Sequence, residues 1–265
     1  MPGLDRGRVG AVVRRHAYVQ KRVPHRWFDV LVWPVVDTVI WGSIGRFVDQ
    51  QGGATRAGAA YMLSGILLMH VLYQASISVS TGFLEETWSR NLLNLMVTPL
   101  REGEYLLGVL IVGLGRLAVS MAMVALAAFS LYAFDVTDAG LGLVPIVAVL
   151  MVVGWCISLV VIALSLRFGN GAEILAWGLL FIVIALSGAF YPLEAVPGPL
   201  RPFSQALPST HAFQAARALV DGEPLPWRRI GLSVAGLAVL VPATVGFLLH
   251  MLRTFRRRGF VTRYS

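Results

Sequence analysis

Six blocks of apolar residues, each long enough to cross a lipid bilayer as a helix, constrain this chain more than any other feature. About 20 apolar residues cross a hydrocarbon core of roughly 30 Å, because a helix rises about 1.5 Å per residue. The blocks are Val30–Val48, Ala59–Phe83, Tyr105–Phe134, Leu143–Leu166, Ile174–Tyr191 and Ile230–Leu252. Only 14% of the 265 residues are charged, whereas soluble domains carry about 25%. We therefore expect an all-α integral membrane protein: one transmembrane domain over residues 1–265 with six transmembrane helices.

Basic residues are distributed unevenly between the two ends of the predicted spans. Fifteen of the 22 lysines and arginines fall on the side that holds both termini, six fall on the other side, and Arg116 lies within a span. Because lysine and arginine accumulate in cytoplasmic segments, we expect a multi-pass protein with both termini in the cytoplasm. This flanking pattern also argues against nucleic-acid binding, although the formal net charge is +8.

The composition also bears on cellular location and metal binding. Arginine greatly outnumbers lysine, and alanine, glycine and valine are abundant, which is typical of a GC-rich bacterial genome. We therefore expect the bacterial cytoplasmic (inner) membrane. The single cysteine, Cys156, lies within an apolar block, so it cannot form an intrachain disulfide or a cysteine-pair metal site. The basic N-terminal stretch shows no secretory signal peptide.

Residues 5–28, before the first span, place apolar and basic side chains on different sides of a helix. The side opposite the basic residues consists of residues that recur at a spacing of three or four: Val9, Val12, Val13, His16, Val19, Val23 and Trp27. Most of the basic residues fall elsewhere around the helix, which is typical of an amphipathic helix in the headgroup layer of a membrane. Pro24 is expected to bend or end it. A solvated basic tail is the alternative interpretation.

Residues 191–227 lie between the fifth and sixth predicted spans and differ in kind from the spans. They contain seven prolines, which exclude one continuous helix. Many of the remaining residues are apolar, so the segment does not resemble an ordinary solvated loop. We expect one or two short re-entrant helices that enter the outer leaflet, where other parts of the protein satisfy the broken backbone.

Motifs of common enzymes are absent from the sequence. The only lysine, Lys21, lies between Gln20 and Arg22, so the phosphate-binding loop Gly-Lys-Ser/Thr is missing and the chain is expected to have no ATP site of its own. No histidine is followed by glutamate, and no Gly-x-Ser-x-Gly motif occurs. We therefore expect a chain without enzymatic activity; an intramembrane enzyme with a dispersed site is the alternative.

Polar residues inside the spans need a reason, because an Arg or Asp at a helix centre costs about 2.5 to 3.5 kcal/mol on insertion. Asp37 lies in the first span, with Trp41 one turn later, and His70 and Tyr73 are three residues apart in the second. Such residues indicate either a substrate path or structural hydrogen bonds between spans, and both interpretations stay open. Arg116 is expected to extend towards the cytoplasmic interface.

The cytoplasmic segment 84–104 carries an unusual apolar surface. Glu85 and Glu86 open it, and Thr98-Pro99 interrupts it near its end. The apolar residues between them are Leu92, Leu93, Leu95 and Met96, followed by Leu100. A plain connector does not need such a surface, so we expect a protein partner in the cytoplasm; an interfacial helix resting on lipid is the alternative.

Three features together resemble the membrane permease of type-2 ATP-binding cassette (ABC) transporters, most of which export drugs, lipids or polysaccharides. The first is the stretch from Glu85 through Leu92-Leu93 to Thr98-Pro99-Leu100 and Glu104. The second is Tyr191-Pro192-Leu193 with Pro197, then Leu207-Pro208-Ser209-Thr210-His211 and Arg217. The third is the N-terminal amphipathic helix combined with six spans and both termini inside. The resemblance covers nearly the whole chain.

The resemblance implies a separate nucleotide-binding ATPase subunit that carries ATP and Mg, a second permease copy as homodimer or close heterodimer, and contact with membrane lipid. No cofactor or metal is expected in this chain. Residues 90–100 would dock into the ATPase, and ATP-driven closure would pass through them to the first, second and fifth spans. The coupling residues are Glu85, Glu86, Arg90, Leu93, Thr98, Pro99, Leu100 and Glu104.

The expected function is the permease half of an ATP-driven exporter of an amphiphilic, lipid-like, drug or glycan substrate. Asp37, Trp41, His70 and Tyr73 are the candidates for its translocation pathway, because aromatic and polar side chains face a cavity more readily than lipid. An ion-coupled secondary transporter is the alternative, although it would usually show internal repeats and more midplane carboxylates. A membrane anchor or assembly factor is a third possibility.

Overall fold

The computed structural model describes residues 5–23, 27–50, 57–88, 98–135, 140–168 and 172–258, and within these ranges it contains helices and no strand. The helices are α1 (Arg6–Arg22), η1 (Phe28–Val32), α3 (Trp33–Gln50), α4 (Ala57–Trp88), α6 (Glu102–Tyr132), α7 (Leu143–Phe168), α8 (Ala172–Ser187), η4 (Leu193–Ala195), η5 (Gly198–Leu200), α9 (Arg201–Ala206), α10 (Pro208–Val220) and α11 (Trp227–Arg258). The predicted all-α class is confirmed.

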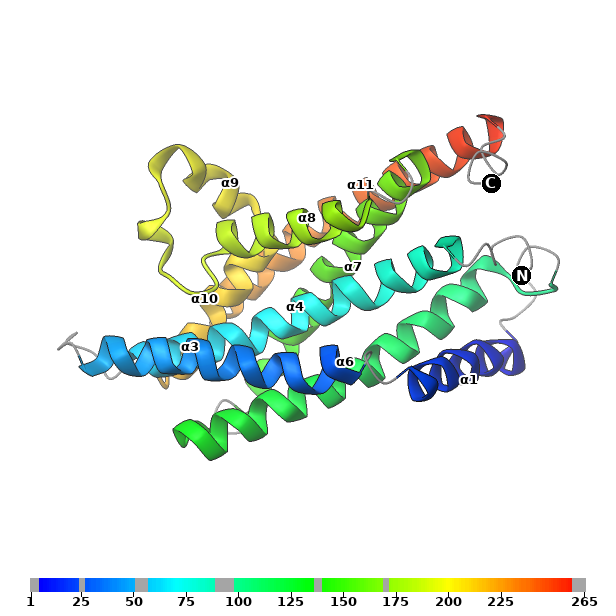
Figure 1. The fold of residues 1–265 in the computed structure, drawn as a ribbon. Coiled ribbons are helices and arrows are strands. Elements are labelled where there is room, and N and C mark those ends of the chain that lie inside the picture. Colours follow the sequence, from blue (N-terminus) through cyan, green and yellow to red (C-terminus); the bar gives the residue numbers. More distant parts are fainter. Residues whose placement is uncertain are drawn as a thin grey trace.

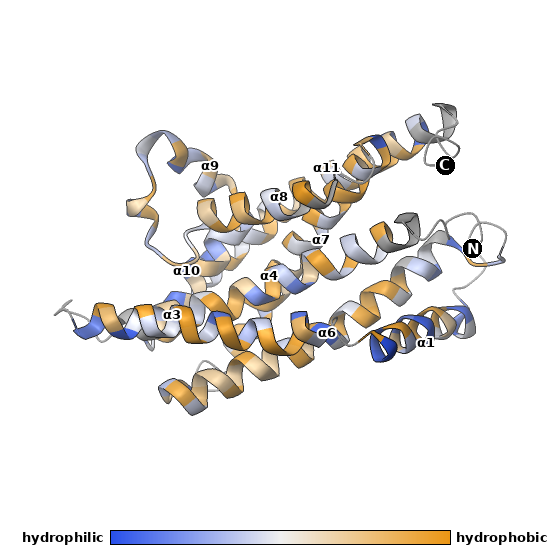
Figure 2. Ribbon diagram, in the orientation of Figure 1, coloured by the Kyte–Doolittle hydropathy of each residue, from blue (hydrophilic) through white to orange (hydrophobic). Residues whose placement is uncertain are grey.

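Five of the described helical segments are long and apolar enough to cross a membrane. They are Phe28–Gln50, Ala60–Leu84, Gly103–Tyr132, Gly140–Phe168 and Trp227–Thr254. In Figure 1 the corresponding helices run along the bundle, and the start of α1 and the end of α11 lie at the same end of it. Orange residues run along these helices in Figure 2, as expected for a lipid environment. The chain is therefore a multi-pass membrane protein.

The fifth predicted span differs from its expectation. Helix α8 has 16 residues and ends at Ser187, so it is shorter than the roughly 20 residues that cross a bilayer. The chain turns directly after it, because Gly188 adopts a φ of +61°, a conformation that favours glycine. The predicted range Ile174–Tyr191 thus holds a short apolar helix followed by a turn.

Helix α4 forms the centre of the bundle and contacts α3, α6, α7, α8 and α10. Close approach of α7 to α4 depends on Gly154, where an added Cβ would lie 2.8 Å from the Leu72 carbonyl oxygen. Next to it the Ser158 hydroxyl donates to the Ser76 carbonyl oxygen at 2.5 Å. Small residues and hydroxyls at helix contacts are typical of membrane bundles, where dispersion and hydrogen bonds replace the hydrophobic effect.

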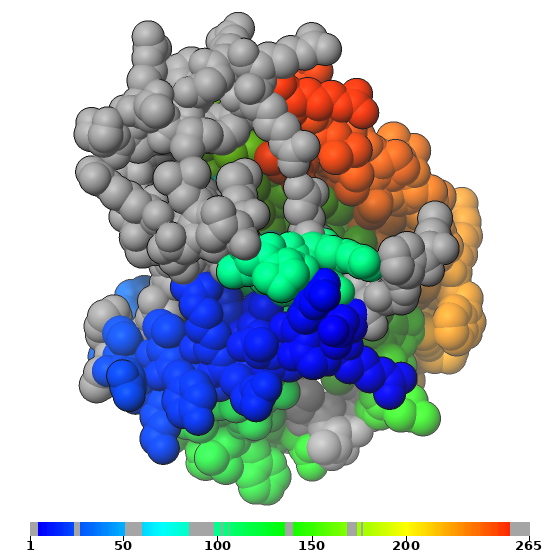
Figure 3. All heavy atoms as spheres, turned by 90° about the vertical axis from the view of Figure 1, so that its right-hand side faces the viewer, coloured from blue at the N-terminus to red at the C-terminus, as the bar shows by residue number. Residues whose placement is uncertain are grey.

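Helix α1 lies within residues 5–28, where an amphipathic N-terminal helix is expected, and its location in the headgroup layer stays a prediction. Asp5 caps it by accepting a hydrogen bond from the Gly7 N–H at 2.8 Å. Its apolar side packs on protein, because Val9 and Val12 are buried and an added Cβ at Gly108 of α6 would lie 2.6 Å from Val12 Cγ1. In Figure 3 the rest of α1, in deep blue, lies on the surface of the molecule.

The proline-rich segment 191–227 forms two short α-helices, α9 and α10, joined to the bundle by hydrogen bonds. Pro208 begins α10, and its carbonyl oxygen accepts from the Ser233 hydroxyl at 2.9 Å. Arg217 donates to the carbonyl oxygens of Gly188 and Tyr191, and its guanidinium lies 4.1 Å from the centre of the Tyr61 ring. These bonds attach α10 to α8, α4 and α11. Entry of the segment into the outer leaflet stays a prediction.

Candidate functional site

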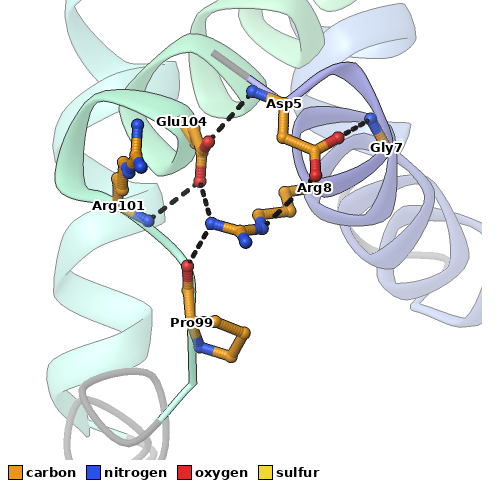
Figure 4. A network of polar contacts seen from close by, with 6 residues as sticks. All are labelled: Asp5, Gly7, Arg8, Pro99, Arg101 and Glu104. Carbon is orange, nitrogen blue, oxygen red and sulfur yellow. Dashed lines mark hydrogen bonds and ion pairs between the residues drawn. The ribbon is translucent and has the colours of Figure 1, made fainter. Parts of the chain in front are cut away.

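A buried carboxylate, that of Glu104, joins the start of α6 to the start of α1. Its side chain is fully buried, and its two oxygens accept backbone N–H groups from two segments: Oε1 from Asp5 and Oε2 from Arg101, each at 3.0 Å. Figure 4 shows the carboxylate between the two chain segments. Asp5 and Glu104 are 99 residues apart in sequence, so this contact fixes the position of α1 relative to α6.

Arg8 of α1 connects the same carboxylate to the end of the predicted coupling segment 84–104. Its Nη1 lies 3.6 Å from Glu104 Oε2 and donates to the Pro99 carbonyl oxygen at 2.6 Å. Its Nε lies 3.5 Å from Asp5 Oδ2. Six residues form this site, which we call the α1–α6 junction: Asp5, Gly7, Arg8, Pro99, Arg101 and Glu104. A displacement of Pro99 must therefore displace α1 and α6 or break the Arg8 contacts.

The structure places only part of the predicted coupling segment. Pro99 belongs to the junction, Thr98 and Leu100 flank it in sequence, and Leu100 packs partly buried against a cluster that includes Val12. Glu85 and Glu86 lie in the last turns of α4, although their side chains are not described. Arg90 and Leu93 lie outside the described residues. Docking of an ATPase on this segment is therefore still a prediction.

A second charged site lies within the membrane-spanning region, where η1 meets α4 and α6. Arg116 Nη2 lies 3.0 Å from Asp29 Oδ2, and the Tyr73 hydroxyl donates to Asp29 Oδ1 at 2.5 Å. Asp29 belongs to the single π-helical turn η1, and such turns are often found at functional sites. Arg116 thus pairs with an acid at the start of the first span. Its extension towards the cytoplasmic interface stays a prediction.

The four pathway candidates fall into two places. Asp37 Oδ2 lies 3.5 Å from His70 Nε2, and the rings of His70 and Tyr73 meet edge to face with centroids 6.1 Å apart. These three residues therefore lie together between α3 and α4. Trp41 lies apart from them, stacked on Phe190 with ring centroids 4.2 Å apart and planes inclined by 2°. Substrate contact by any of the four stays a prediction.

Several buried polar atoms of α4 and α6 have no hydrogen-bond partner in the described part of the chain. They include His70 Nδ1, both amide atoms of Gln74, Nε of Arg116 and the hydroxyls of Ser78 and Ser120. Buried polar groups are costly without a partner, and more so in a membrane.

Two surface cavities open on the described structure. One, of about 560 Å³, lies between the ends of α3 and α6 and is lined by Val39, Ser43, Arg46, Phe47, Gln50, Leu131 and Tyr132. The other, of about 200 Å³, is lined by residues that include Ser64, Leu67, Leu143, Ala216 and Leu219. Neither is lined by a pathway candidate, and the described residues hold no cluster of three or more His, Cys, Asp or Glu side chains that could bind a metal.

Sequence reasoning missed Asp5, Arg8 and Asp29 as members of these sites. Asp29 lies one residue before the first predicted span, so it is not among the polar residues expected inside the spans. Asp5 at the start of a predicted helix is a signal for a helix cap, but its backbone bond to Glu104 depends on contact between distant segments. Glu104 was predicted to belong to the coupling segment, and its burial explains why an acid stands there.

Comparison with known proteins agrees with this architecture. A family model described as "ABC-2 family transporter protein" matches residues 48–249, most of the chain. No curated protein matches the chain significantly. Membership of this family implies a separate nucleotide-binding ATPase subunit as partner. The chain therefore belongs to the ABC-2 family of transporter proteins and is the transmembrane permease component of an ABC transporter.

Proposed function

We propose that the chain is the membrane half of an ATP-driven exporter for an amphiphilic, lipid-like, drug or glycan substrate. Two copies, or this chain and a close relative, would form the pathway, and a separate ATPase would supply ATP and Mg. The α1–α6 junction carries this proposal, because it connects the end of the predicted docking segment to two helices by a buried carboxylate and Arg8. The family match is consistent with it.

The junction suggests how movement of the ATPase would reach the membrane. Movement of the ATPase against residues 90–100 would displace Pro99. The carbonyl oxygen of Pro99 accepts a hydrogen bond from Arg8 of α1, and Pro99 lies three residues before α6 begins at Glu102. A helix transmits displacement along its axis because its backbone hydrogen bonds are internal. Arg116, further along α6, then passes the movement to Asp29 and the first span.

The first span supports the proposed pairing with a second copy. Its exposed large apolar side chains include Val36, Ile40, Ile44 and Phe47. Lipid or another permease can cover such a surface, and pairing of permeases would place the Asp37 and His70 group near the shared interface. We propose the bacterial cytoplasmic membrane, with the junction end of the bundle in the cytoplasm. The two ends of the described chain lie together there (Figure 1).

Coexpression of the chain with its genomic neighbours tests the proposal. The chain is purified in mild detergent, and the copurifying protein is assayed for ATP hydrolysis. We expect a P-loop ATPase to copurify, and substitutions of Pro99 or Leu93 to release it. Pro202→Ala, in α9 at the other side of the bundle, is the matched control and should leave the ATPase bound.

Two outcomes would contradict the proposal. If the chain purifies alone and moves solute on an ion gradient after reconstitution, it is a secondary transporter. If the ATPase copurifies equally well with the Pro99 and Leu93 variants, the docking segment is wrong. Transport by the complete complex into inverted vesicles, with ATP present on the outside only, tests the direction.

A further inference from the structure

Helix α1 carries three of its six basic residues on the side opposite its packed side. Val9 and Val12 are buried against α6, and the residues on the other side are exposed. Successive residues advance by about 100° around a helix, which places this exposed side roughly 180° from Val9 and Val12. The basic face of α1 consists of Arg14, Tyr18, Lys21 and Arg22, all exposed. The sequence of α1 contains no acidic residue.

Contacts with the spans fix the depth of α1. Val12 lies against Gly108 of α6, where an added Cβ would be 2.6 Å from Val12 Cγ1. The neighbouring residue, Val109, faces Gly82 of α4, with 3.5 Å between Val109 Cγ1 and an added Cβ. Gly82 is near the end of the candidate span Ala60–Leu84. Helix α1 therefore lies level with the end of the apolar region, where lipid headgroups are found.

The direction of the basic face follows from the side of α6 on which α1 packs. Helix α1 contacts the flank of α6. The basic face of α1 therefore points away from the bundle, towards the headgroup layer of the surrounding membrane. The next described residues after Val23 are exposed aromatic residues: Trp27 is 38% exposed and Phe28 52%. Exposed aromatic rings of this kind gather where lipid meets water. The flank of the molecule that carries α1 is thus bordered by lipid.

We propose that the basic face of α1 binds the headgroups of anionic phospholipids at the edge of the permease, and that this contact holds α1 on α6. Three cations on one side of a short helix, with no acid on that helix, are complementary to an anionic headgroup layer. Tyr18, 65% exposed in their midst, suits the same interfacial environment. An acidic surface of the ATPase subunit is the competing occupant that the test must exclude. The proposal requires only that the chain lies in a membrane, and not that it exports.

The test measures thermal unfolding of the purified full-length chain in a neutral detergent with added lipid. Phosphatidylglycerol and phosphatidylcholine with identical acyl chains are compared. We expect phosphatidylglycerol to raise the unfolding temperature at a lower concentration. In Arg14→Gln/Arg22→Gln the phosphatidylglycerol concentration for half the effect should rise about 25-fold, roughly fivefold for each basic residue lost. Arg14→Lys/Arg22→Lys should behave as the wild type. The control Arg46→Gln/Arg228→Gln removes two other exposed arginines and should also be unchanged.

Salt gives a second reading of the same contact. Raising the ionic strength to about 1 M shortens the screening length to roughly 3 Å and should remove most of the preference for phosphatidylglycerol. Equal stabilisation of the wild type by both lipids would overturn the proposal. So would an Arg14→Gln/Arg22→Gln variant that keeps the wild-type preference. If that variant keeps the preference and also loses a copurifying ATPase, the basic face binds the ATPase and not lipid.

Discussion

Asp29 and Arg116 should stabilise the chain together. We expect their free energies of unfolding to be coupled, so that the effects of replacing each residue are not additive. Arg116 Nη2 lies 3.0 Å from Asp29 Oδ2, and the two side chains are 18% and 31% exposed. A hydrogen bond to a charged group contributes about 1.5–3 kcal/mol, and removal of one member of a fully buried pair costs about 3–5 kcal/mol. Partial exposure reduces the second value, so we expect a coupling energy of about 1.5–3 kcal/mol.

A double-mutant cycle measures this coupling directly. Asp29→Asn, Arg116→Gln and the double variant are unfolded reversibly in mixed detergent micelles, and their free energies of unfolding are compared with the wild type. Tyr73→Phe is a useful third variant, because it removes only the hydroxyl that donates to Asp29 Oδ1. Arg167→Gln, an exposed arginine at the end of α7, is the control. Independent sites add within about 0.5 kcal/mol, so a coupling below that value would refute the reasoning.

Three further predictions concern packing, coupling and the pathway. Gly154→Ala should lower the free energy of unfolding by about 1–3 kcal/mol, because its Cβ would lie 2.8 Å from the Leu72 carbonyl oxygen. Gly246→Ala, with open space around it, should change the free energy of unfolding little when both variants are unfolded in the same detergent micelles. Glu104→Ala should leave ATP hydrolysis by the purified complex but reduce transport, and Glu104→Gln, which keeps an acceptor oxygen, should reduce it less; equal transport by both variants and the wild type would contradict the junction. Asp37→Asn should slow transport, and an unchanged rate there would remove Asp37 from the pathway.

Five of the six predicted spans follow from the sequence as long apolar helices, because each apolar block must cross a layer of fixed thickness. The length of α8 did not follow, since its apolar block continues to Tyr191 while the backbone turns at Gly188. That turn is held by Arg217, 29 residues later, through a hydrogen bond to the Gly188 carbonyl. Composition along the chain carries no information on such a distant partner.

The partners of the polar residues were the least predictable part of the site. Whether two side chains meet depends on the rotation and the register of helices that are distant in sequence. The sequence identifies Asp37 and His70 as polar residues in two different spans. The distance of 3.5 Å between Asp37 Oδ2 and His70 Nε2, however, depends on how α3 lies on α4. Trp41, one turn from Asp37, stacks on Phe190 after α8 and so leaves the polar group. In contrast, Glu104 could be singled out from the sequence because the acidic-to-proline pattern that contains it is local; its role in coupling stays a prediction.

The two charged contacts of α6 should act in series if the junction drives the first span. Glu104 and Arg116 are twelve residues apart, which is about 18 Å along the helix. The first holds α1 and the end of the docking segment, and the second holds Asp29. A movement that passes through both contacts is already interrupted when one is lost. Transport by Glu104→Ala/Arg116→Gln, measured on vesicles with equal amounts of folded complex, should therefore match the poorer single variant. If the two fractional losses multiply instead, the contacts act independently, and α6 does not carry the movement from Pro99 to the first span.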